Sequence, residues 1–138
     1  MRKGGLFVSK NFWNSLAIAA VVVIPTISIG ALEAAAQSYG AIARSSSTQD
    51  KGYSWNFRTR ATAENRAISE CESSSGAGDC EVLVWARNAC MSIAESSNGA
   101  AGTAWAVDDV QAERMAGDVC RDFGGTGCST VRTICLPY

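Results

Sequence analysis

The sequence predicts an α+β fold: a disulfide-stapled single domain in which an antiparallel sheet packs against two helices. Three observations lead to this prediction. Matching segments recur about 50 residues apart, so the domain is expected to contain two β-β-α-β repeats. Within each repeat, apolar residues follow a strand-like period and then a helix-like period. Six cysteines follow an apolar N-terminal segment, which is typical of an exported protein held together by disulfides.

Residues 1–36 have the features of a signal peptide. Three basic residues precede the segment 16–32, which is almost wholly apolar, and Ala34 and Ala36 are the small residues that signal peptidase reads. We predict cleavage after Ala36, which leaves a secreted or periplasmic chain 37–138 without stable membrane insertion. An uncleaved membrane anchor is the alternative, because about 20 apolar residues can span a bilayer.

Charge and composition narrow the range of functions. The chain has 12 basic and 13 acidic residues, of which the leader holds three and one, so the remainder has nine and twelve and a net charge of −3. Nucleic-acid binders rely on clustered basic residues, so no nucleic-acid partner is expected. The absence of histidine removes the ordinary Ser-His-Asp triad and the usual Cys-His zinc sites. We predict neither a cofactor nor a metal.

Matching segments place copy one at about 39–89 and copy two at about 90–138. The spacing between equivalent residues shortens along the copies, as expected when connections lose residues and strands and helices do not. The matching pairs are AIA (41–43) with SIA (92–94), GYSWNF (52–57) with GTAWAV (102–107), and AENRA (63–67) with AERMA (112–116).

Each copy should contain three strands. In copy one these cover about 39–44, 53–58 and 80–85, and the middle strand alternates aromatic with polar residues, which is typical of a half-buried strand. Because large aromatic residues on strands usually build the core, we expect Trp55 and its counterpart Trp105 to be buried.

One helix should follow the second strand of each copy. Thr59 and Asp108 are the expected N-caps, and Gln111 completes a capping box with Asp108. The carboxylate of Asp108 is therefore assigned to capping and not to a calcium site. In each helix, two alanines and a cysteine at i, i+4 and i+8 mark the buried face. These residues are Ala63, Ala67 and Cys71 in the first helix and Ala112, Ala116 and Cys120 in the second.

The cysteines are expected to form three disulfides, although six cysteines allow fifteen pairings. In both copies one cysteine ends the helix and another opens the next strand, so Cys71 should pair with Cys80, and Cys120 with Cys128. The remaining pair, Cys90 with Cys135, is then expected to tie the junction between the copies to the C-terminus.

Several of these segments resemble a known protein family. YGAIA and GYSW in copy one, VLVWARNAC at the junction and the second AW are similar to the small secreted bacterial family called domain of unknown function 4189. The resemblance covers roughly Tyr39 to Cys135, and RNAC (87–90) is its most specific part. It implies a scaffold and a compartment outside the cytoplasm, and it implies no activity.

The predicted function is binding without catalysis, as an effector, an inhibitor or an envelope-interaction module with a protein or envelope partner. A possible binding surface includes Trp85, Arg87 and Tyr53, and Trp85 is expected to be the more open tryptophan. No catalytic residue is assigned. The alternative is a small hydrolase of extracellular or cell-wall polymers that uses Glu64 or Glu113 as its acid or base. Both glutamates are expected on exposed helix flanks.

Overall fold

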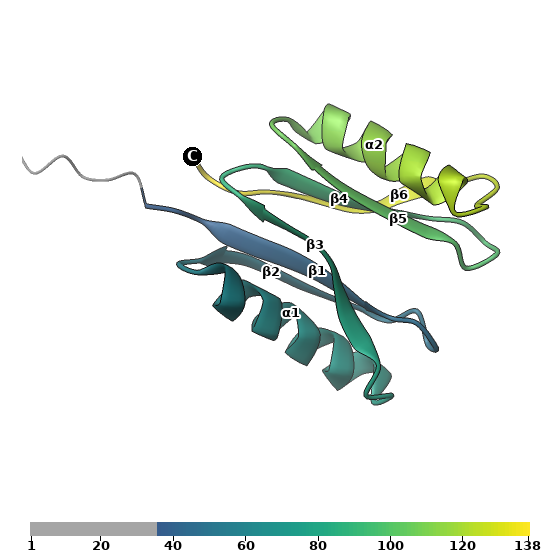
Figure 1. The fold of residues 1–138 in the computed structure, drawn as a ribbon, viewed down its shortest axis with the longest axis horizontal. Helices are drawn as coiled ribbons and strands as arrows, with labels where there is room; N and C mark the ends of the chain where they lie inside the picture. Colours follow the sequence, from purple (N-terminus) through teal and green to yellow (C-terminus); the bar gives the residue numbers. More distant parts are fainter. Residues whose placement is uncertain (1–35) are drawn as a thin grey trace, which may run out of the picture. The chain divides into compact units, whose positions relative to one another are not determined.

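The structure, a computed structural model, describes residues 36–138, in which the order β-β-α-β occurs twice (Figure 1). The predicted signal peptide lies outside these residues except for Ala36, and its cleavage stays a prediction. Copy one contains β1 (Tyr39–Ser45), β2 (Lys51–Phe57), α1 (Arg60–Ser75) and β3 (Cys80–Arg87). Copy two contains β4 (Cys90–Glu95), β5 (Ala101–Ala106), α2 (Asp109–Asp122) and β6 (Ser129–Cys135).

The strands form two antiparallel sheets, with the orders β2-β1-β3 and β5-β4-β6. The α+β class and the repeated plan are thus confirmed, whereas the single sheet implied by the sequence is replaced by one sheet per copy. Helix α1 covers the outer face of the first sheet and α2 covers the outer face of the second (Figure 1). Neither helix among residues 36–138 is long and apolar enough to cross a bilayer.

The chain changes sheets between β3 and β4 through only two residues. Asn88 makes this possible because it adopts the left-handed backbone conformation, with φ of 49°. Its side-chain oxygen accepts a hydrogen bond from the N–H of Ser38 (2.8 Å), and its own N–H donates to the Ser38 carbonyl (2.9 Å). An asparagine thus makes a turn that contains neither glycine nor proline.

The helices begin and pack as predicted. Thr59 accepts a hydrogen bond from the N–H of Thr62, and Asp108 accepts one from the N–H of Gln111. In both helices the two predicted alanines and the cysteine are fully buried against the sheet.

The helices approach the sheets very closely, and this changes the expected position of two tryptophans. Gly52 and Ser54 face α1, and the Ser54 hydroxyl donates to the Ala63 carbonyl at 2.7 Å. Because this side of β2 is filled by helix backbone around Gly52 and Ser54, Tyr53 and Trp55 take the other side. Trp55 is consequently 47% exposed and Trp105 is 56% exposed, so their predicted burial is wrong.

The core between the sheets comes from the alternate residues of the central strands. In β1, Ala41 and Ala43 belong to the cluster beneath α1, whereas Ile42 points away from the helix. Ile42 packs with Met91 and Ile93 of β4, and all three are fully buried. Strands β1 and β4 are therefore covered on both faces, which accounts for their small and apolar composition.

An ion-pair cluster also joins the two sheets. Arg44 Nε lies 2.7 Å from Glu95 Oε1, and Lys51 Nζ lies 2.8 Å from Glu95 Oε2. Arg44 also donates to the Gly99 carbonyl at 3.1 Å. Burial by itself would raise the pKa of Glu95, but the hydrogen bonds from Lys51 and Arg44 outweigh it and hold that pKa below its ordinary value. Arg44 and Glu95 occupy equivalent positions in the two copies, so opposite charges meet where the copies pack together.

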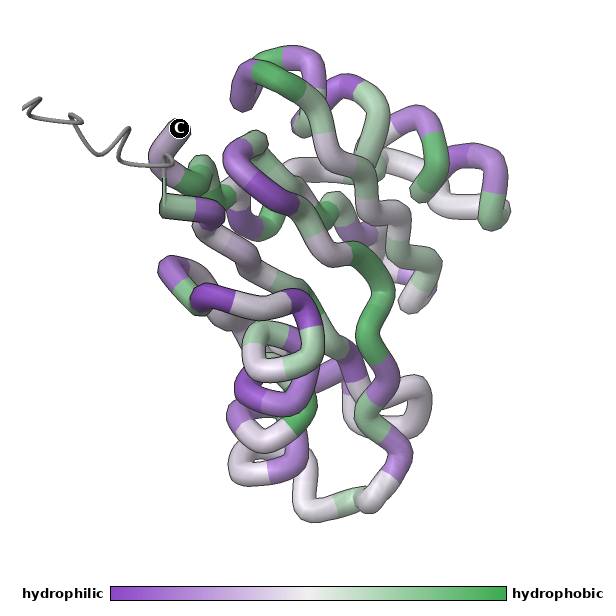
Figure 2. Tube along the Cα trace, turned by 60° about the vertical axis from the view of Figure 1, so that its left-hand side comes forward, coloured by the Kyte–Doolittle hydropathy of each residue, from purple (hydrophilic) through white to green (hydrophobic). Residues whose placement is uncertain are grey.

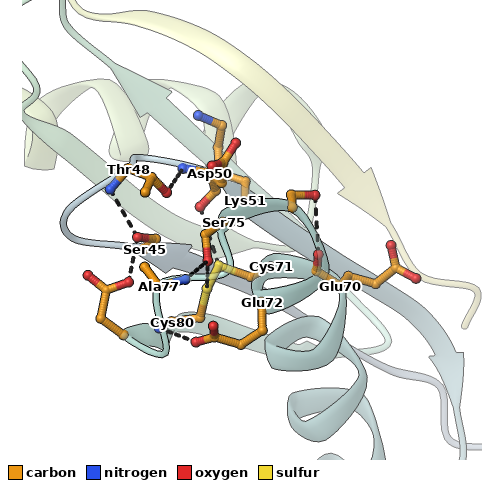
Figure 3. Close-up of a disulfide and its surroundings, with 12 residues drawn as sticks. Ser45, Thr48, Asp50, Lys51, Glu70, Cys71, Glu72, Ser75, Ala77 and Cys80 are labelled. Atoms are coloured by element: carbon orange, nitrogen blue, oxygen red, sulfur yellow. Dashed lines mark hydrogen bonds between the residues drawn. A yellow bond between two sulfur atoms is a disulfide. The ribbon is translucent and has the colours of Figure 1, made fainter.

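The structure contains the three disulfides predicted from the sequence. Cys71–Cys80 and Cys120–Cys128 each join a helix to the start of the following strand, and Figure 3 shows the first of these bonds. Cys90 and Cys135 face each other directly on β4 and β6. This bond therefore ties the junction between the copies to the C-terminus, as predicted, and both of its cysteines belong to copy two.

Candidate functional site

The most distinctive surface feature is a pair of grooves at equivalent places in the two copies. One, the charged groove, lies along the outer edge of β2. It is lined by Tyr53, Ser54, Trp55, Phe57, Arg66, Glu70 and Arg132. The other, the apolar groove, lies along the outer edge of β5. It is lined by Leu83, Val84, Thr103, Ala104, Trp105, Ala106, Val107, Gln111, Met115 and Val119.

Strand register and helix phase show which residues of the grooves correspond. Val84 pairs with Ile42 and Arg132 pairs with Ile93, so Val84 and Arg132 are equivalent. By the same reasoning Tyr53 corresponds to Thr103. The buried alanines of the helices align the rest: Arg66 with Met115, and Glu70 with Val119. Three charged residues of one groove are thus apolar in the other.

The charged groove has a volume of about 330 Å³. The Arg132 guanidinium lies over the Tyr53 ring, 4.6 Å from its centroid, and 5.5 Å from the Trp55 centroid. Arg66 and Glu70 form an ion pair across one turn of α1 at the other side of the groove. Burial raises the pKa of Tyr53, although the nearby positive charge of Arg132 lowers it, and the net shift is upward. The phenol therefore remains a neutral hydrogen-bond donor near neutral pH.

The apolar groove is larger, at about 530 Å³. Leu83 is 42% exposed, Met115 is 40% exposed and Trp105 is 56% exposed. Figure 2 shows the apolar centre of β3 as a continuous green stretch. Thr103 Oγ1 donates to the Leu83 carbonyl at 3.2 Å and so connects β5 to the opposite sheet. An exposed cluster of this kind is typical of an interaction surface.

The structure separates the residues of the predicted binding surface. Trp85 and Arg87 line a hollow of about 320 Å³ together with Tyr39 and Trp105, and Trp105 also lines the apolar groove. Tyr53 lies in the charged groove instead. Trp85 is half-buried, beneath the guanidinium of Arg60 at 4.3 Å, so its expected openness relative to Trp55 and Trp105 is wrong.

The two glutamates of the hydrolase alternative are not arranged as the carboxylate pair that this reaction needs. Glu64 on α1 pairs with Arg60 at 2.7 Å, and Glu113 on α2 accepts a hydrogen bond from Thr133 Oγ1 at 2.7 Å. Both are half-buried, which corrects their predicted exposure. Glu64 and Glu113 lie on helices that cover opposite outer faces, and both sheets stand between these two helices (Figure 1). Paired carboxylates must flank a single bond, so these two do not form one site.

A third group, Glu72, Asp79 and Cys80, brings together atoms of the types that bind metals. The Cys80 sulfur is bonded to Cys71, and Glu72 accepts hydrogen bonds from the N–H groups of Gly78 and Cys80, both at 2.7 Å. The carboxylate oxygens of Glu72 therefore hold the loop beside the disulfide (Figure 3). The Asp79 carboxylate similarly accepts hydrogen bonds from the end of β1 and the turn that follows it.

Asp79 is expected to make stability depend on acid pH. The Ser45 hydroxyl, at 2.5 Å, is the main reason that the pKa of Asp79 lies well below its ordinary value, and Ser47 and Ser46 add further hydrogen bonds. A carboxylate with a lowered pKa in the folded state stabilises it above the unfolded-state pKa, near 4, and this stabilisation is lost as the pH falls further.

The free energy of unfolding should therefore decrease below about pH 4. In Asp79→Asn the loss should already be present at pH 7, and the decrease toward acid pH should be shallower. Urea unfolding between pH 2 and pH 7 measures both effects. Asp122→Asn, at the exposed end of α2, controls for the removal of a surface carboxylate. Identical pH profiles for wild type and Asp79→Asn would contradict this prediction.

Sequence reasoning overlooked Arg132, Met115 and Val119 as candidate site residues. The signal was present, because aligning the copies by their buried helix alanines sets Arg66 against Met115 and Glu70 against Val119. Recognising Arg132 as the equivalent of Val84 required the strand register, since no sequence match marks that pair.

Comparison with known proteins supports the fold and its family. The chain is similar to Rv1813c from Mycobacterium tuberculosis, whose structure was determined by NMR, with 24% sequence identity and a TM-score of 0.52 over 98% of each chain. No curated protein matches the sequence. The sequence profile of DUF4189, a domain of unknown function, matches residues 39–135. With this match spanning the β-β-α-β repeats and all three disulfides, the chain belongs to the DUF4189 family.

Proposed function

We propose that this protein is a non-catalytic binding protein, secreted or periplasmic, whose apolar groove binds an extended apolar segment of a partner protein. One observation carries the proposal: the apolar groove has Met115, Val119 and Val84 where the charged groove has Arg66, Glu70 and Arg132. The shared scaffold accommodates charges at these positions, so folding does not require exposed apolar side chains there. Three disulfides suit a protein of an oxidising compartment.

The edge of β5 supports an extended ligand. Among residues 36–138, strand β5 pairs with β4 alone, so backbone groups along its other side have no ladder partner there. A strand added at this edge would place alternate side chains between Met115 and Val119 on α2 and Leu83 on β3. The adjoining hollow of Trp85 and Arg87 extends the same surface through Trp105.

Peptides selected from a random displayed library test the proposal. We expect them to alternate apolar residues and to bind through β5, which hydrogen exchange would detect as protection of the β5 amides. The double variant Met115→Arg/Val119→Glu should weaken binding more than tenfold, because truncating or replacing hot-spot residues costs about 2 kcal/mol or more. It copies residues that α1 already carries, so the helix should fold.

The matched control is Arg66→Met/Glu70→Val, which makes the reverse change in the charged groove and should leave peptide affinity unaltered. Selected peptides without apolar alternation, or equal binding by the two double variants, would contradict the proposed function.

A further inference from the structure

The charged groove contains a cation that the rest of the protein does not neutralise. The side chain of Arg132 forms neither an ion pair nor a hydrogen bond within the part of the chain that the structure describes. It is nevertheless held against the rings of Tyr53 and Trp55. Its N–H donors are therefore positioned by stacking and remain free for a ligand.

The fold gives no structural reason for this charge. Valine occupies the equivalent position, Val84, on the corresponding strand and opposite an equivalent isoleucine. Arg132 also lies in an acidic context, since residues 37–138 have a net charge of −3 (nine basic and twelve acidic residues). A stacked arginine that lines a groove without an ion-pair partner among the described residues is suited to an anionic ligand.

We propose that the charged groove binds the terminal carboxylate of an extended peptide, with Arg132 as its bidentate partner. A planar carboxylate matches the fork of a guanidinium. The positive charge of Arg66 is already balanced by Glu70, so a single free cation faces the ligand, which favours a monoanion over a doubly charged phosphate.

The position of the groove favours a peptide over an acidic sugar. The groove follows the edge of β2, which within the described part of the chain pairs with β1 alone and so presents unpaired backbone groups. An extended peptide uses these groups through its main chain while its carboxylate reaches Arg132. Trp55, about half exposed, lies beside this path and offers contact to the last side chain.

A titration followed by the NMR signals of the Trp55 indole and the β2 amides tests the assignment. The probe is acetyl-Ala-Val-Ala-Val with a free C-terminal carboxylate, and its C-terminal amide, galacturonate and inorganic phosphate are the comparisons. The free acid should bind at least tenfold more tightly than the amide. Arg132→Val should reduce affinity by about tenfold to a hundredfold, as expected for loss of charged hydrogen bonds.

Two further variants make the test specific. Arg114→Val removes an exposed arginine of α2 outside both grooves and should change nothing. Arg132→Lys keeps the charge but loses the fork, and should bind more weakly than wild type. Equal binding of acid and amide, unchanged binding by Arg132→Val, tighter binding of galacturonate or phosphate, or no binding of the peptide would each overturn the proposal. The proposed function concerns the opposite groove, so the two tests fail independently.

Discussion

Replacing Gly52 by alanine is expected to lower the free energy of unfolding by about 3 kcal/mol, at the upper end of the usual cost of overpacking. A Cβ atom at this position would stand 1.9 Å from the Ala67 carbonyl oxygen and 2.4 Å from the Cys71 nitrogen. Both are helix backbone atoms, so no side-chain rotation relieves the contact. Helix α1 would have to move away from β2, and the Cys71–Cys80 bond opposes that movement.

The same change in copy two should have a similar effect. At Gly102 the added atom would stand 2.1 Å from the Cys120 nitrogen and 2.3 Å from the Ala116 carbonyl oxygen. Gly117→Ala is the matched control, because that glycine lies in α2 with its nearest contact at 3.5 Å. It should stabilise the helix by roughly 0.5–1 kcal/mol. Urea unfolding under non-reducing conditions measures all three, and a loss below about 0.5 kcal/mol for Gly52→Ala would contradict the close packing.

Removal of the Cys90–Cys135 disulfide should cost more than removal of either shorter bond. Its cysteines are 45 residues apart, compared with 9 for Cys71–Cys80 and 8 for Cys120–Cys128. On the chain-entropy account, a loop of this length restricts the unfolded state by about 4 kcal/mol, and the short loops by about 2.5 kcal/mol.

The test replaces both cysteines of a pair by alanine, so that no free thiol remains. The Cys90→Ala/Cys135→Ala variant should show the lowest unfolding midpoint in urea, and the Cys120→Ala/Cys128→Ala variant should lie between it and wild type. Because the β4–β6 ladder persists without the bond, the fold should survive in both. A greater loss from the shorter bond would show that the unfolded-state argument does not govern this protein.

Much of the fold was predictable because local chemistry repeats. The buried helix alanines, the caps at Thr59 and Asp108 and the two short cysteine pairs follow from comparing one copy with the other, and Cys90–Cys135 is the pair that remains. The number of sheets was not predictable in this way. It depends on the turn at Asn88, where a left-handed residue sends the chain to a new sheet, and such a residue has no periodicity to reveal it.

The candidate site was less accessible to sequence reasoning than the fold. A period-two pattern shows that Trp55 and Ser54 point to opposite sides of β2, but it does not show which side the helix occupies. The close approach of α1 gives the helix side to the small residues. Arg132 was overlooked because its aromatic neighbours belong to the other copy, and only the packing of the sheets brings them together.

The pairing of Arg44 with Glu95 has a consequence for how whole molecules recognise one another. These residues hold the same position in the two copies, so two first copies meeting in this arrangement would set arginine against arginine, and two second copies would set glutamate against glutamate. Like unit charges about 4 Å apart repel by about 4 kcal/mol at an effective dielectric constant of 20. Each half therefore prefers its unlike neighbour, and the charges disfavour an association between two first copies or between two second copies of different molecules.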